Sequence, residues 1–147
     1  MKNPGSLFAV TLLWTATLVL AATLGTSEAA MQTLQLSGTL ETPHVATKAS
    51  GEATLNVDEN GVVSGGVKTK DINGTAAHIH MGEPGMSGPP IITLERAGKD
   101  QWIVPQGSKL TVEQLSDYKR GALYVNVHSK AHPDGEIRAQ LTAPTGP

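Results

Sequence analysis

Cysteine is absent from all 147 residues, so neither disulfide bonds nor thiolate chemistry is available to this chain. Aromatic residues are scarce, with two Trp, two Tyr and one Phe, which is too few for a sugar-stacking platform. The 11 Lys and Arg nearly balance the 13 Asp and Glu, and no run of like charge is present. These features exclude nucleic acid and anionic membranes as expected partners.

Long apolar stretches are also missing, except for the run from Leu7 to Leu24. Lys2 precedes this run and Ser27-Glu28-Ala29 follows it, which is the pattern of a secretory signal peptide. We therefore expect residues 1–29 to be removed after Ala29, leaving one domain over residues 30–147 that is secreted or periplasmic. The run just reaches the length of a membrane span, so a retained N-terminal anchor is the alternative; after cleavage no stable membrane span is expected.

Alternating apolar residues predict an all-β domain of about eight short strands. The predicted strands are 33–40, 52–57, 62–69, 76–81, 90–95, 101–105, 121–128 and 135–142. Asn60-Gly61 predicts a tight turn that pairs the second and third of these as antiparallel neighbours. Strand number and spacing are typical of a β-sandwich or barrel.

One short helix is predicted within residues 110–121. Thr111 can cap its N-terminus, Gln114 completes a capping box, and Gly121 can end it in the left-handed conformation.

Two histidines alternate with apolar residues in the sequence AHIHM, residues 77–81. Ala77, Ile79 and Met81 should face the core, which places His78 and His80 on the opposite face with Cα atoms about 7 Å apart. The same alternation places His128 outward, and the turn His132-Pro133-Asp134-Gly135 returns His132 toward it. His44 is expected to be a surface loop residue.

Four imidazoles on one face, His78, His80, His128 and His132, are a candidate site for copper or zinc. The competing interpretation is a polar network without an ion, in which Asn126, Glu136 and Arg138 support the histidines and tie a loop to the sheet. Gly82, Gly85 and Gly88 should let that loop fold over the histidines and shield them from water.

Catalytic patterns are weak. Ser87 lacks the G-x-S-x-G elbow of a serine hydrolase, and Glu136 with Arg138 is first an ion pair between neighbours on one face. A His-x-His pair also occurs in copper/zinc superoxide dismutase, which leaves a dismutase-like enzyme as a remote alternative. We expect no enzyme.

The sequences AHIHMGEPGMSGPPIITL, LTVEQL and GALYVNVHSKAHPDGEIRAQL closely resemble the CHRD domain, first described in chordin and also found as an exported single domain in bacteria. The resemblance covers most of residues 31–142; Ala139 stands where members often carry glycine. It implies an extracytoplasmic β-sandwich or Greek-key barrel with no established catalytic activity or cofactor. The combined expectation is a non-enzymatic binding or structural module, whose ligand is an unidentified protein or a metal ion.

Overall fold

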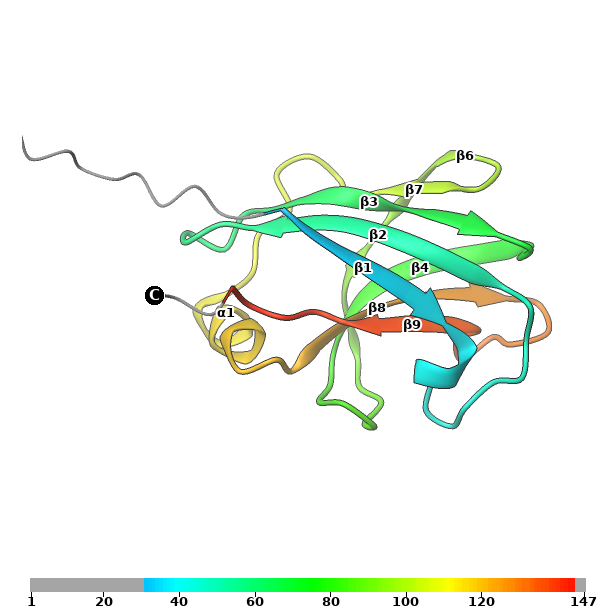
Figure 1. The fold of residues 1–147 in the computed structure, drawn as a ribbon. Coiled ribbons are helices and arrows are strands. Elements are labelled where there is room, and N and C mark those ends of the chain that lie inside the picture. The colour runs from blue at the N-terminus through cyan, green and yellow to red at the C-terminus, as the bar shows by residue number, and fades with distance from the viewer. Residues whose placement is uncertain (1–30, 145–147) are drawn as a thin grey trace, which may run out of the picture.

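The computed structural model describes residues 31–144, so the predicted signal peptide lies outside the described part of the chain. Within these residues the fold is all-β with one α-helix, as predicted (Figure 1). The first half holds β1 (Gln32–Ser37), a 3-10 turn η1 (Gly38–Leu40), β2 (Ser50–Val57), β3 (Val63–Lys70) and β4 (Gly74–Met81). The second half holds β5 (Pro90–Thr93), β6 (Glu95–Gly98), β7 (Gln101–Ile103), α1 (Val112–Lys119), β8 (Leu123–Ser129) and β9 (Ile137–Gln140).

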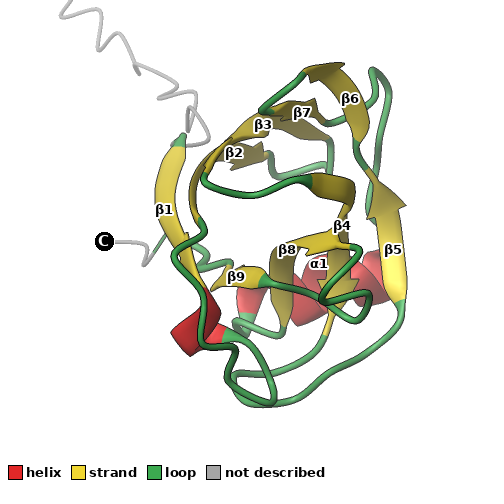
Figure 2. Cartoon of the chain, turned by 90° about the vertical axis from the view of Figure 1, so that its right-hand side faces the viewer, coloured by secondary structure: helices red, strands yellow, loops and turns green. Residues whose placement is uncertain are grey.

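All nine strands belong to one antiparallel sheet in the order β5-β4-β8-β9-β1-β2-β3-β7-β6. Its two end strands, β5 and β6, are consecutive in sequence and separated only by Leu94. The sheet therefore curls into a nearly closed barrel (Figure 2). This explains why nine strands form where about eight were predicted: the segment 90–98 pairs first with β4 and then, past Leu94, with β7.

The predicted hairpin and helix cap are confirmed. β2 and β3 pair over eight residues, and Gly61 in their turn has a φ of 81°. Thr111 Oγ1 accepts the Gln114 backbone N–H, while Gln114 Oε1 accepts the Thr111 N–H, which together form the capping box. Gly121, just past the helix, has a φ of 77°.

The barrel interior contains the core that the alternation predicted. Every second residue of β4, β8 and β9 points into it, so the residues between them point away from it. The most enclosed members of the core include Leu36, Leu55, Val67, Ile79, Val125, Val127 and Ile137. Trp102 is also buried there.

Candidate functional site

Strand register places polar residues side by side on the face of β4, β8 and β9 that points away from the barrel core. His78 lies opposite Asn126, which in turn lies opposite Arg138. His80 lies opposite Tyr124 in the same way, and Tyr124 lies opposite Gln140. Because directly paired residues in antiparallel strands project to the same side, these side chains form one surface, which we call the polar face.

The polar face is buried under loops, whereas alternation alone had indicated only that it points away from the core. His80 and His128 are 7% and 8% exposed, and Asn126 and Arg138 are each 1% exposed. Alternation reports only which side of a strand a residue occupies, so it cannot show that loops cover that side. Two segments contact this face: residues 82–89, called here the covering loop, and the chain between β1 and β2.

Side chains of β9 hold the covering loop by donating hydrogen bonds to its backbone carbonyls. Arg138 donates hydrogen bonds to Met86 O at 2.9 Å and to Glu83 O at 3.0 Å. Gln140 Nε2 donates to Gly82 O at 2.7 Å and accepts from Arg138 through Oε1 at 2.8 Å. The loop therefore packs against a buried guanidinium whose donors are directed at its carbonyl oxygens.

Glycine is required in the covering loop for two different reasons. A Cβ on Gly82 would lie 2.8 Å from both Met86 O and the Tyr124 ring, and one on Gly88 would collide with Met81 O. Gly85 has open space around it but a φ of 78°, within the turn closed by the Met86 N–H to Glu83 O bond.

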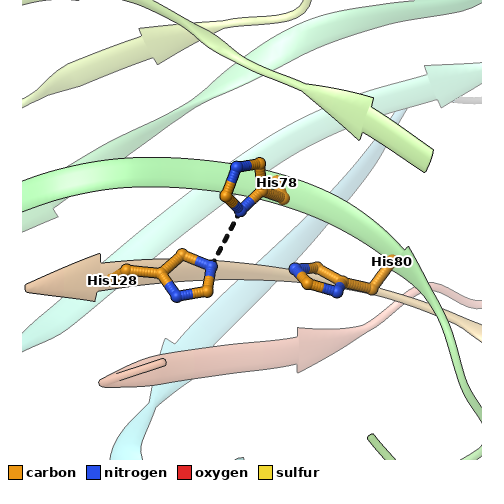
Figure 3. A group of neighbouring side chains, drawn as sticks. All are labelled: His78, His80 and His128. Atoms are coloured by element: carbon orange, nitrogen blue, oxygen red, sulfur yellow. Dashed lines mark hydrogen bonds between the residues drawn. The ribbon is translucent and has the colours of Figure 1, made fainter. Parts of the chain in front are cut away.

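Three imidazoles converge at one end of the polar face (Figure 3). His78 and His80 come from β4 and His128 comes from β8, and one ring nitrogen of each lies within 4.8 Å of the others. The shortest approach is 2.8 Å, between His78 Nδ1 and His128 Nε2. We call these three residues the histidine triad.

Backbone carbonyls fix the tautomers of two triad members. His80 Nδ1 lies 2.8 Å from Gly88 O, and His128 Nδ1 lies 2.8 Å from Pro133 O. A carbonyl oxygen can only accept, so each Nδ1 carries the proton and each Nε2 presents a lone pair. His78 Nδ1–H can then donate to the lone pair of His128.

Two buried acceptors of the site have no hydrogen-bond partner among the described residues. They are His80 Nε2 and Asn126 Oδ1. Burial lowers the pKa of His80, while the hydrogen bond to the Gly88 carbonyl opposes that shift. Burial, together with repulsion from His128 and His80, lowers the pKa of His78 to about 4. Both rings are therefore neutral near pH 7, with nitrogen lone pairs available to a ligand.

The remaining polar residues hold the triad in place. The His80 ring stacks on Tyr124, with ring centroids 4.8 Å apart, and the Arg138 guanidinium lies 3.5 Å from the centre of the Tyr124 ring on β8. Glu136 accepts a 2.6 Å hydrogen bond from Thr47 Oγ1, which ties the β1–β2 connection to this face.

Sequence reasoning missed Glu41, which is buried beside the polar face. Burial raises the pKa of Glu41, and the charge of Arg138 opposes this shift. A Cβ on Gly135 would lie 2.5 Å from Glu41 Oε1 and 2.6 Å from Asn126 Nδ2, so both side chains press against that glycine. No sequence pattern points to Glu41, because it lies in an irregular segment between strands.

His132 does not join the triad. Its turn forms as predicted, since the Gly135 N–H donates to the His132 carbonyl, but its imidazole is outside the group of nitrogens within 4.8 Å. The four-histidine site of the sequence analysis is thus a three-histidine site in the structure. His44 is exposed, as expected.

Comparison with known proteins agrees with this architecture. The CHRD domain family matches residues 32–141, which is most of the chain. Chordin from Xenopus laevis is 30% identical over 119 residues, covering 74% of this chain but only 12% of chordin. No solved structure matches. This chain therefore belongs to the CHRD domain family.

The relative constrains function only broadly. This chain spans about an eighth of the length of chordin. Membership of the family is consistent with a non-enzymatic module. Among residues 31–144, no helix is long and apolar enough to cross a membrane.

Proposed function

We propose that this domain is an exported, non-enzymatic binding module that holds one copper or zinc ion in the histidine triad. The single observation that carries the proposal is the locked orientation of His80 and His128, whose Nδ1–H groups are both bound to backbone carbonyls. Ligating histidines in metalloproteins characteristically donate their second N–H in this manner, which orients the ring and its lone pair toward the ion.

The donor chemistry suits these metals. Imidazole nitrogen is a favourable ligand for zinc and copper, and neutral rings need not lose a proton before binding. The unpartnered lone pair of His80 Nε2 and the nearby Asn126 Oδ1 are buried acceptors that a cation would satisfy.

Only small movements are needed to fit an ion. Zinc–nitrogen bonds of about 2.0–2.1 Å in a tetrahedron place the nitrogens about 3.3 Å apart. The 2.8 Å distance between His78 Nδ1 and His128 Nε2 must therefore increase by about 0.5 Å. The largest distance between ligand nitrogens of the triad, which is at most 4.8 Å, must decrease toward about 3.3 Å. Rotation of the half-buried His78 side chain can open its separation from His128.

The competing function is a structural one, in which the polar face serves only to lock the covering loop. The bonds from Arg138 and Gln140 support that role, and it requires no ion. The two functions differ in their use of the Nε2 lone pairs: Arg138 and Gln140 hold the loop without the triad, and His80 contributes to the loop only through its Nδ1–H bond to Gly88 O.

Calorimetric titration of chelator-treated protein, purified without a histidine tag, separates the two. We expect one zinc or copper ion per chain, with affinity lowered at least about tenfold in His80→Gln and in His128→Gln. His132→Gln and His44→Gln are matched controls that should bind like the wild type. Absence of saturable binding, or equal affinity in all four variants, would reject the metal function and favour the structural one.

A further inference from the structure

The charge around the histidine triad is unfavourable for a bare divalent ion. All three ligands are neutral side chains, and no carboxylate of the described residues joins their group. The nearest buried charge is the Arg138 guanidinium, whose positive charge contributes to the lowered pKa of His80. A divalent ion here would have no anionic ligand among the described residues.

Two buried carboxylates lie beside the polar face. Glu136 accepts its hydrogen bond from Thr47 on the β1–β2 connection. Glu41 lies against Gly135 and the Nδ2 side of Asn126, and within residues 31–144 its Oε1 has no hydrogen-bond partner. Neither carboxylate belongs to the group of ligand atoms within 4.8 Å of one another.

The triad is open to solvent on one side. His80 and His128 are buried, whereas His78 is only half-buried. On β5, Thr93 is the direct cross-strand partner of His78 and is exposed. Paired side chains on neighbouring strands project to the same side with Cβ atoms about 5 Å apart, so Thr93 borders the solvent access to His78.

We propose, on the basis of the metal function above, that the ion in the triad binds a small exogenous anion as its fourth ligand, reached past His78 and Thr93. Three protein ligands and one position for solvent or a small molecule is the usual arrangement of an open zinc site. The anion displaces the water on the metal and supplies the negative charge that this ligand set lacks. The ligand class is therefore a small inorganic anion or a carboxylate.

Cobalt(II) is the appropriate probe, because its visible absorption reports a change of ligand. We expect cobalt-loaded protein to show a saturable spectral change on titration with sodium azide or sodium acetate. Perchlorate at the same ionic strength should give no change. If cobalt binds but its spectrum is unaffected by azide and acetate, the anion proposal is wrong while the metal function stands. If no cobalt binds to the triad, both fail.

Thr93 offers a matched pair of variants that tests the route. A carboxylate in Thr93→Glu should reach the ion from within the chain, so we expect azide to bind at least about tenfold more weakly than in Thr93→Gln. Thr93→Gln is nearly isosteric with the glutamate and should bind azide like the wild type. Equal azide affinity in the two variants would contradict access beside Thr93.

Discussion

Replacing Arg138 by lysine tests whether one buried guanidinium holds the covering loop. Arg138 donates to Met86 O, Glu83 O and Gln140 Oε1, and it lies 3.5 Å from the Tyr124 ring centre. Lysine keeps the positive charge, but its ammonium is a compact point charge that cannot reproduce the planar fork of donors.

The expected loss follows from these contacts. Hydrogen bonds to a charged group contribute about 1.5–3 kcal/mol each, and a desolvated cation–π contact contributes about 2 kcal/mol. If lysine keeps one hydrogen bond and loses two, together with about half of the stacking, the free energy of unfolding should fall by about 4–7 kcal/mol. That is a large share of the stability of a domain of this size.

Urea unfolding followed by tryptophan fluorescence measures this difference, since Trp102 is buried in the core. Arg120→Lys is the matched control: Arg120 also binds Glu83, but its side chain is 54% exposed. An exposed ion pair of this kind contributes about 0–1 kcal/mol. A loss below about 1 kcal/mol in Arg138→Lys, or equal losses in both variants, would refute the reasoning.

Three further outcomes are expected. Zinc at 100 times its dissociation constant should add about 2.7 kcal/mol, which for the 114 residues from 31 to 144 raises Tm by about 11 °C in calorimetry; no shift would argue against native-state binding. The pKa of His78 is lowered to about 4 in the folded protein, so between about pH 6.5 and pH 4 the unfolded chain binds a proton at His78 that the folded protein does not. The free energy of unfolding is therefore unaffected by His78 above about pH 6.5 and decreases as the pH falls toward 4. The urea midpoint of metal-free protein should therefore fall over that range, and less steeply in His78→Gln. Gly135→Ala, at a φ of 131° and against Glu41 and Asn126, should lower stability by more than about 1 kcal/mol in the same assay, whereas Gly107→Ala, at a φ of 83° in open space, reports backbone strain alone.

Local sequence signals predicted the local structure well. Asn60-Gly61 set the β2–β3 hairpin, and Thr111 with Gln114 set the start of α1. Alternation also assigned Ala77 and Ile79 to the core and His78 to the opposite side. Each of these depends on residues near one another in the chain, where turn chemistry and side-chain periodicity act directly.

Long-range packing was beyond the same signals. The register that places His78 near His128, 50 residues later, follows from pairing of β4 with β8, which the sequence did not specify. The glycines at 82, 85 and 88 indicated a loop over the histidines, but the hydrogen bonds that hold this loop and the β1–β2 connection in place join distant segments, which local signals do not specify. Likewise, the turn after β8 forms around the His132 carbonyl, which accepts the N–H groups of Ser129 and Gly135, while the His132 ring stays outside the triad.

The most direct test of the metal centre is anomalous X-ray scattering from crystals of the protein loaded with zinc or copper. We predict one strong peak per chain, bonded to His80 Nε2, His128 Nε2 and one nitrogen of His78, below the covering loop. A well-ordered polar face with no anomalous peak among these rings, or with peaks only at exposed histidines such as His44, would contradict a metal centre in this domain.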